Sequence, residues 1–421
     1  MIKRISIDQL QPGMVVQSFV GDWPAETFHF FGKTVPDRQS ITELTDVGIR
    51  ELYVHVHADE GEPDLPTQED VERLLEGQLR ELGGETDPHA PPDADWQERL
   101  GHELEEAVKI EKAVREEANR TLESVRMGGQ VDLPTVISAS RRSMESIFRD
   151  HEALTAIALL KNRSDQAFEH SVNVAIHLQA FGRLMGWSEE EVVDIGVAGM
   201  LHDLGMAKVP FHIVRKTGRL TRGELQLCHQ HVEFTLQILE SVPNLSEKAW
   251  LVAAQHHERF DGTGYPKSQT GRETSIEGEI AAIIDTFDAM TSWRPYHKPL
   301  DNYLALRRMM EFSNYQYNMG LFQFFVTCVG LFPVGTVVHL KDSSRAVVVS
   351  NHRNALLFPV VRLLTDATGK AVEEGRWINL SQHQDEEGLA IVGAESETAK
   401  GPVNPFKYLP NAKSFRMPAS A

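Results

Sequence analysis

Short apolar runs that alternate with turn residues mark the two ends of the chain. Near the N-terminus, residues 13–17 have strand-like composition and residues 51–57 alternate apolar and polar positions. Near the C-terminus the period of two returns at 336–340, 345–349 and 359–364. We therefore predict a small N-terminal domain with strands over residues 1–60, a small β appendage over 333–395 and a flexible tail over 396–421.

The middle of the chain has helical spacing and clear helix start signals. Ser188-Glu-Glu-Glu191 and Thr221-Arg-Gly-Glu224 are capping boxes, in which the hydroxyl and the glutamate each satisfy a backbone N–H of the first turn. A periodic apolar run follows each of them. These signals predict an all-helical domain over residues 140–332 and a fold that is mainly α.

Charge is unevenly distributed along the 421 residues. The formal net charge is −19, and the segment from Asp59 to Glu123 holds 21 acidic against 7 basic residues. We interpret residues 61–139 as an acidic linker that is partly helical. A surface this acidic repels phosphate backbones, so we expect no nucleic-acid partner.

Cysteine usage and the apolar runs predict the compartment. Cys228 and Cys328 cannot build a disulfide framework, which indicates a reducing environment. The N-terminus lacks an apolar core of signal-peptide length, and polar residues and Pro333 interrupt the longest apolar stretch, residues 322–334. We expect a cytoplasmic protein without membrane insertion.

The helical segment concentrates imidazole and carboxylate side chains. In chain order these are His170, His202, Asp203, His231, His256, His257 and Asp285. The pairs His202-Asp203 and His256-His257 each end an apolar helical stretch, so both pairs point towards a shared end of packed helices. Nitrogen and oxygen ligands in this number suit a pair of transition ions better than calcium or magnesium, and the lack of thiolates excludes a zinc finger.

Loops beside these residues offer groups that could hold a phosphate. Asp261-Gly-Thr-Gly-Tyr-Pro266 follows the histidine pair, and its glycines allow close backbone approach to a ligand. Arg294 and Lys298 lie just beyond Asp285, and residues 215–219 form a second basic cluster. These cations either form a basic mouth at the metal site or belong to plain solvated surface.

The ordered motifs resemble those of one bacterial family. Leu201-His-Asp-Leu-Gly205, His256-His-Glu258 and the 261–266 loop resemble the HD-GYP proteins, which are cyclic di-GMP phosphodiesterases of the HD superfamily. The resemblance covers about residues 150–330. Residues 1–57 also resemble the uncharacterised N-terminal domain that often precedes HD-GYP modules.

The resemblance implies hydrolysis of cyclic di-GMP to pGpG, with GMP as the product of any second cut. Two divalent transition ions, Fe or Mn with Zn, Ni or Co as alternatives, would be bound by the seven residues above and bridged by Asp203. The ions would activate a shared water for in-line attack on phosphorus. Asp203, Lys208 and Arg294 would be catalytic, and the substrate would contact Arg294, Lys298, Gly264 and Tyr265.

Two of the chain's three departures from the family pattern refine these expectations. Gln166 stands where some members place a glutamate for a third metal, so we expect two ions. Met206 stands where a lysine usually follows the His-Asp motif, with Lys208 two residues on, so we expect slow turnover. We assign Asp288, one turn after Asp285, to orienting its neighbours rather than to binding metal.

Three functions stay open from the sequence. The first is the phosphodiesterase, with cyclic di-GMP as substrate and protein partners such as diguanylate cyclases. The second is a degenerate, metal-containing cyclic di-GMP receptor that acts through protein partners, which Met206 favours. The third is hydrolysis of another phosphoester, such as a different cyclic dinucleotide. The oligomeric state is open as well.

Overall fold

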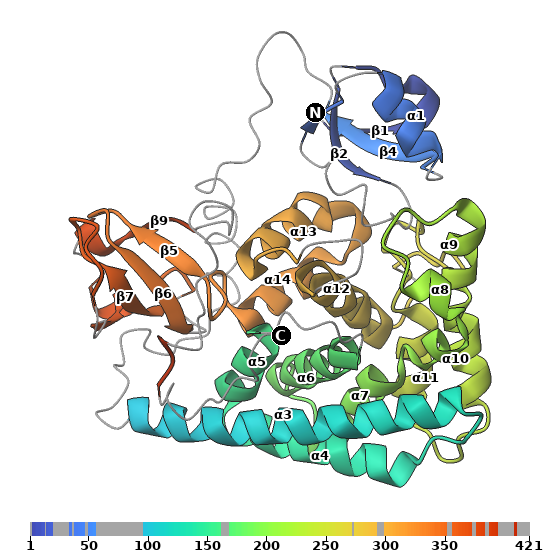
Figure 1. Cartoon of the computed structure of the whole chain (residues 1–421), viewed down its shortest axis with the longest axis horizontal. Coiled ribbons are helices and arrows are strands. Elements are labelled where there is room, and N and C mark those ends of the chain that lie inside the picture. Colours follow the sequence, from blue (N-terminus) through green and yellow to red (C-terminus); the bar gives the residue numbers. More distant parts are fainter. Residues whose placement is uncertain are drawn as a thin grey trace.

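The chain is mainly helical, with one small sheet near each end (Figure 1). The structure, a computed structural model, describes residues 2–12, 14–19, 33–35, 38–46, 49–55, 96–160, 168–271, 273–292, 299–351, 356–372, 376–383, 387–394 and 408–410. The predicted fold class is confirmed by this arrangement of helices and sheets. Among the described helices, none is both long enough and apolar enough to cross a membrane.

The N-terminal sheet is antiparallel with strand order β1-β4-β2-β3. Its elements are β1 (Ile2–Ser6), η1 (Ile7–Gln9), β2 (Val15–Phe19), β3 (Lys33–Thr34), α1 (Arg38–Asp46) and β4 (Glu51–His55). The strands predicted at 13–17 and 51–57 correspond to β2 and β4. Val16, Leu44 and Leu52 are buried between the sheet and α1, and they give this domain its core.

The helical part contains the following elements. They are α3 (Trp96–Arg126), α4 (Leu133–Arg149), α5 (His151–Leu159), α6 (Phe168–Leu184), α7 (Glu189–Leu201), η3 (Leu204–Lys208), α8 (Phe211–Val214), α9 (Arg222–His229), α10 (His231–Leu239), α11 (Glu247–Gln255), α12 (Ile276–Thr291), α13 (Asn302–Gln316) and α14 (Met319–Val329). Both predicted capping boxes are confirmed. Ser188 caps α7 and Thr221 caps α9, each with its glutamate bonded back to the cap.

The charged run before residue 126 forms a packed helix. α3 lies with α4 along one side of the helical domain (Figure 1). Its apolar stripe, which includes Leu100, Leu104 and Val114, is buried against that domain. The domain boundary predicted at residue 139 therefore falls inside α4, and residues 61–95 of the predicted linker lie outside the described part.

The C-terminal sheet is antiparallel with strand order β8-β7-β6-β5-β9. Its elements are β5 (Val337–Leu340), β6 (Arg345–Ser350), β7 (Val360–Thr365), β8 (Trp377–Asn379), η4 (Leu380–Gln382), η5 (Glu387–Leu389) and β9 (Ile391–Ala394). The three predicted strands are β5, β6 and β7. β8 and β9 have three and four residues, too few for a periodic signal. Of the predicted tail, only residues 408–410 are described.

Close contact between α6 and α7 fixes the centre of the helical domain. A Cβ atom on Gly199 of α7 would lie 2.5 Å from the Ala175 Cα atom of α6. Because the two helices are consecutive and joined by a short turn, the start of α6 lies beside the end of α7. This arrangement brings His170 next to His202, with ring centroids 5.5 Å apart.

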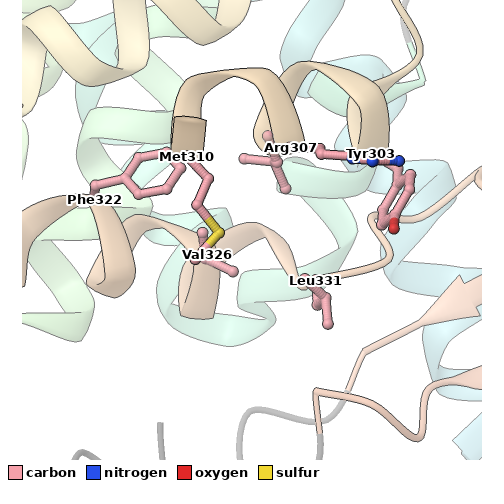
Figure 2. A pocket seen from close by; sticks show the side chains of 7 residues that line it. Tyr303, Arg307, Met310, Phe322, Val326 and Leu331 are labelled. Atoms are coloured by element: carbon pink, nitrogen blue, oxygen red, sulfur yellow. The ribbon is translucent and has the colours of Figure 1, made fainter. Parts of the chain in front are cut away.

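A small apolar cavity lies between α13 and α14 (Figure 2). It is lined by Tyr303, Leu306, Arg307, Met310, Phe322, Val326 and Leu331. Its volume is about 10 Å³, which is space for at most one water molecule. The cavity is thus a packing defect rather than a ligand site.

We predict that Gly199→Ala destabilises the protein by about 1–3 kcal/mol, because the added methyl group forces α6 and α7 apart. Urea denaturation followed by circular dichroism measures this change. Gly218→Ala is the matched control, since a Cβ atom there meets nothing within 4 Å. Equal unfolding midpoints for the two variants would show that the helix contact tolerates the methyl group.

Candidate metal centre

All seven predicted metal ligands lie at or near the ends of helices that meet at one place. His170 is in the first turn of α6, and His231 is the first residue of α10. His202 and His256 are the C-caps of α7 and α11, each followed by the next candidate ligand, Asp203 or His257. Asp285 lies within α12. Helix packing thus gathers ligands that are up to 115 positions apart in the sequence.

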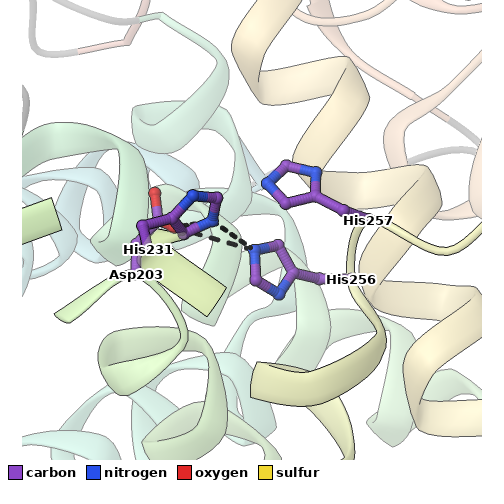
Figure 3. A group of neighbouring side chains, drawn as sticks. All are labelled: Asp203, His231, His256 and His257. Carbon is purple, nitrogen blue, oxygen red and sulfur yellow. Dashed lines mark hydrogen bonds and ion pairs between the residues drawn. The ribbon is translucent and has the colours of Figure 1, made fainter. Parts of the chain in front are cut away.

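The seven side chains form two groups. One group is Asp203, His231, His256 and His257, and the other is His170, His202 and Asp285. Within each group the ligand atoms lie within 4.8 Å of one another. Figure 3 shows the first group, with its imidazoles directed towards the Asp203 carboxylate.

Asp203 faces both groups. Its Oδ1 atom lies 3.2 Å from Nε2 of His231 and 3.6 Å from Nε2 of His256. Its Oδ2 atom lies 3.8 Å from Nε2 of His202 and 3.9 Å from Nε2 of His170. A carboxylate whose two oxygens point at different sets of ligands occupies the position that a bridging ligand requires.

Backbone carbonyls fix the orientation of three of the histidines. Nδ1 of His202 donates to the Gly199 carbonyl at 2.7 Å, and Nδ1 of His231 donates to the Cys228 carbonyl at 2.6 Å. His256 makes the same kind of bond to Val252 at 3.0 Å. When Nδ1 carries the proton, Nε2 presents its lone pair to the centre, as metal-binding histidines do.

Two aspartates hold His170. Its Nδ1 atom lies 2.7 Å from Asp288 Oδ2, and its Nε2 atom lies 2.9 Å from Asp285 Oδ1. Burial alone lowers the pKa of His170, but hydrogen bonds and charge from Asp285 and Asp288 outweigh burial and raise the pKa to about 9. Asp288 contacts the ring edge that faces away from Asp285, as the orienting role predicted for it requires.

The two central carboxylates stay ionised although Asp285 is buried and Asp203 is largely shielded from solvent. Burial raises the pKa of Asp203, yet His202, His231 and His256 hold it well below its usual range. Asp285 behaves in the same way, with His170 as its main partner. Burial lowers the pKa of His257 well below its ordinary value, so this imidazole is neutral and able to bind a metal ion.

Unsatisfied atoms show that a cation fits this cluster. Within the described part of the chain, neither Nε2 of His202 nor Oδ1 of Asp203 has a hydrogen-bond partner, although both atoms are buried. Leaving such atoms without partners costs about 1–3 kcal/mol each, and a bound cation removes that cost. The side chains of Asp203 and His257 are 22% and 18% exposed, which makes them the open side of the cluster.

Gly205 explains how Asp203 comes so close to α10. A Cβ atom at this position would collide with the carbonyl oxygen of His231. The Gly205 amide also donates to Oγ1 of Thr235 at 2.8 Å. The absence of a side chain therefore lets η3 lie directly on the first turn of α10.

Glu258 holds the loop that follows the histidine pair in place. The sequence motif alone did not reveal this role. The buried Glu258 carboxylate accepts hydrogen bonds from the Lys267 amide at 2.8 Å and the Gln269 amide at 2.9 Å. A Cβ atom on Gly264 would collide with the backbone at His257, so this glycine allows close packing of the loop. Both residues hold the loop against the cluster.

Tyr265 lies between two histidine rings. It stacks on His257 with centroids 4.6 Å apart and planes at 19°, and on His229 with centroids 4.0 Å apart and planes at 11°. Burial, followed by the proximity of His231, lowers the pKa of His229 to about 4. Sequence reasoning missed His229, because no motif or spacing distinguishes it.

The other predicted site residues are placed as follows. Arg294, Lys298 and Gln166 lie outside the described residues. The Lys208 ammonium lies 5.8 Å from the centre of the Phe234 ring, and no contact between it and the seven ligands is found in the described part. In the basic cluster at 215–219, Lys216 forms an ion pair with Glu224 at 2.6 Å.

Comparisons with known proteins agree with this geometry. Family models match an HD domain at residues 155–321, a domain of unknown function (DUF3391) at residues 2–136, and a KOW domain associated with HD domain at residues 337–398. The first of these matches spans all seven candidate ligands. The N-terminal match covers both the strand-containing domain and the acidic segment that follows it.

Three curated relatives are similar to this chain. A cyclic di-GMP phosphodiesterase of Pseudomonas aeruginosa is 31% identical over 88% of this chain and 87% of its own length. A cyclic di-GMP phosphodiesterase of Thermotoga maritima is 31% identical over 52% of this chain and 61% of its own length. A 3′3′-cGAMP-specific phosphodiesterase of Vibrio cholerae is 38% identical over 32% of this chain and 26% of its own length.

We predict that Asp288→Asn lowers the pKa of His170 in the metal-free protein from about 9 towards or below 6.5, because a charged partner is lost while burial remains. A raised folded-state pKa stabilises the fold fully below the unfolded value near 6.5, and this contribution is lost as pH rises through 9. The variant should therefore lose less stability than wild type between pH 6.5 and 9.

NMR titration of the His170 imidazole, with urea denaturation at both pH values, measures these two effects. Asp194→Asn is the control, since this aspartate lies in the middle of α7 and not in the cluster. An unchanged His170 pKa in Asp288→Asn would show that Asp288 does not contribute to raising it.

Proposed function

This chain belongs to the HD-GYP family of HD-domain proteins, and we propose that it hydrolyses cyclic di-GMP to the linear dinucleotide pGpG. The observation that carries the proposal is the position of Asp203, whose oxygens face two separate groups of buried ligands. The substrate of the Pseudomonas relative, which matches most of this chain, supports the choice of cyclic di-GMP. A second cut of the same kind would carry pGpG on to GMP.

We assign two divalent transition ions to the centre, Fe or Mn with Zn, Ni or Co as alternatives. Imidazole nitrogens and carboxylate oxygens without thiolates favour these metals. His231, His256 and His257 would hold one ion, His170, His202 and Asp285 the other, and Asp203 would touch both. Ions bound there would activate water and offset the negative charge of the phosphodiester during attack.

The remaining roles belong to the chain's own side chains. Asp203 and His257 form the exposed side of the cluster, so the scissile phosphate would approach from there. Arg294 and Lys298 are proposed to pair with phosphate oxygens, because both cations follow Asp285 closely in the sequence. Lys208 is proposed to replace the missing lysine at Met206, which requires its ammonium to leave the Phe234 ring.

Two alternatives have specific support. A relative specific for 3′3′-cGAMP matches 32% of this chain, so another cyclic dinucleotide is the second candidate substrate. Met206 cannot donate a proton, which favours a receptor that binds cyclic di-GMP and acts through partners such as diguanylate cyclases. Parallel assays with cyclic di-GMP and 3′3′-cGAMP, combined with binding measurements, separate the three functions.

We predict two metal ions per wild-type chain and a loss of at least about a hundredfold in hydrolysis rate for Asp203→Asn, which keeps the shape but removes the bridging charge. Elemental analysis and chromatography of products from cyclic di-GMP measure both quantities. Asp194→Asn, away from the cluster, should match wild type. Full metal content together with wild-type hydrolysis in Asp203→Asn would refute the bridging role.

We predict that Met206→Lys raises turnover by about tenfold or more, because general acid catalysis typically contributes a hundredfold or more and Lys208 replaces only part of it. Lys208→Ala should lower turnover at equal metal loading. Product formation from cyclic di-GMP is measured at saturating substrate. If all variants bind the substrate and none hydrolyses it, the protein is a receptor; if neither change alters a fast rate, no lysine is needed.

A further inference from the structure

Three aromatic rings from three segments form a continuous stack at the open side of the cluster. His229 ends α9, Tyr265 lies in the loop after α11, and His257 follows the C-cap of α11. The two ring-to-ring distances are 4.0 Å for His229–Tyr265 and 4.6 Å for Tyr265–His257. Both pairs are nearly parallel, at 11° and 19°. Stacks of this kind contribute about 0.5–1.5 kcal/mol per pair beyond the area they bury.

The stack leaves Tyr265 without a free ring face. Each face is covered by an imidazole, so a guanine base cannot stack on this tyrosine while the arrangement persists. Any contact of Tyr265 with a substrate must therefore use its hydroxyl group or its ring edge. The ring itself has another role, which is to support His257.

The backbone also holds Tyr265 in register with His257. The Tyr265 amide donates to the carbonyl oxygen of His257 at 3.1 Å. Gly264, immediately before it, packs so closely on the same backbone that no side chain fits. The tyrosine ring is thus laid directly over the imidazole, and the outer face of the ring is left for His229.

His229 and His231 reach the same ligand group from one short segment. A single residue, Gln230, separates them at the junction of α9 and α10. His231 makes an edge contact with His257 at 4.9 Å, while His229 presses on Tyr265 from the other side. The α9–α10 junction therefore supplies the candidate ligand His231, and it supports a second one, His257, through the Tyr265 ring.

We propose that His229 is a positioning residue that holds His257 in its metal-binding orientation through Tyr265. The inference rests on the proposed function in one respect, since it takes the group of Asp203, His231, His256 and His257 as a metal site. The effect should be confined to this group, because His229 reaches His257 through the Tyr265 ring, whereas His170, His202 and Asp285 belong to the other group. His229 acts through the size and flatness of its ring, and not through a proton.

The test is titration of the metal-free full-length protein with Co²⁺, followed by the visible absorption of the bound ion and by calorimetry. His229→Ala should weaken one of the two Co²⁺ sites by about tenfold or more, and it should change the absorption of that site only. His229→Phe keeps a flat ring, so its Co²⁺ affinity should stay within about twofold of wild type. His212→Ala, an exposed histidine on α8, is the control.

The outcomes separate this inference from the proposed function. Equal Co²⁺ affinity in wild type and folded His229→Ala overturns the inference alone, and so does a His229→Phe variant as weak as His229→Ala. Wild-type protein that binds no Co²⁺ overturns the metal centre and the inference with it. Tyr265→Ala gives a second measurement, since removing the middle ring should weaken the same site even where His229→Ala fails to fold.

Discussion

Two carboxylates must remain ionised inside a largely buried cluster of imidazoles, and the candidate metal centre depends on this requirement. Desolvation opposes charge on Asp203 and Asp285, while the surrounding histidines favour it. Without a cation, a protonated His170 supplies part of the balancing charge, which is why its pKa is raised to about 9. A bound divalent ion would replace that proton, so the metal-free geometry already resembles a binding site. Helix packing brings the ends of α6, α7, α10 and α11 together, and each of these ends supplies a candidate ligand to this balance.

Much of this centre could be predicted from the sequence, because local sequence signals mark where its helices begin and end. Capping boxes fix where α7 and α9 begin, and the adjacent pairs at 202–203 and 256–257 mark where helices end. The seven candidate ligands were predicted in this way with the help of the family resemblance, and the structure brings their side chains together. The division into two groups could not be predicted, since it depends on helix packing at contacts such as Gly199 against Ala175. The strands β8 and β9 were not predicted, because three or four residues are too few to show the alternation of apolar and polar positions.

The supporting contacts were harder to foresee than the ligands. Glu258 stands in a recognised motif, yet only the structure shows its carboxylate holding two backbone amides of the following loop. His229 has no motif at all, because its importance arises from a ring that belongs to a loop 36 positions later. Residues that stack across such a separation have no fixed spacing in the sequence, so no sequence pattern reveals the contact. Candidate ligands can thus be predicted from composition and order, whereas the residues that support them are found only through their contacts.

The net charge of the whole chain affects how the cluster can attract its substrate. The protein carries a formal charge of −19, so a dianionic cyclic dinucleotide is repelled at long range. Among the described cations of the 215–219 cluster, Lys216 is neutralised by Glu224, and Arg215 lies over the ring of Phe211. Attraction for the substrate must therefore be local. Two divalent ions held by two carboxylates and five neutral imidazoles would leave a net charge of about +2, which matches the two phosphates of the substrate. On this reasoning such ions would serve binding as much as chemistry, and a ligand that is slightly misplaced would weaken both.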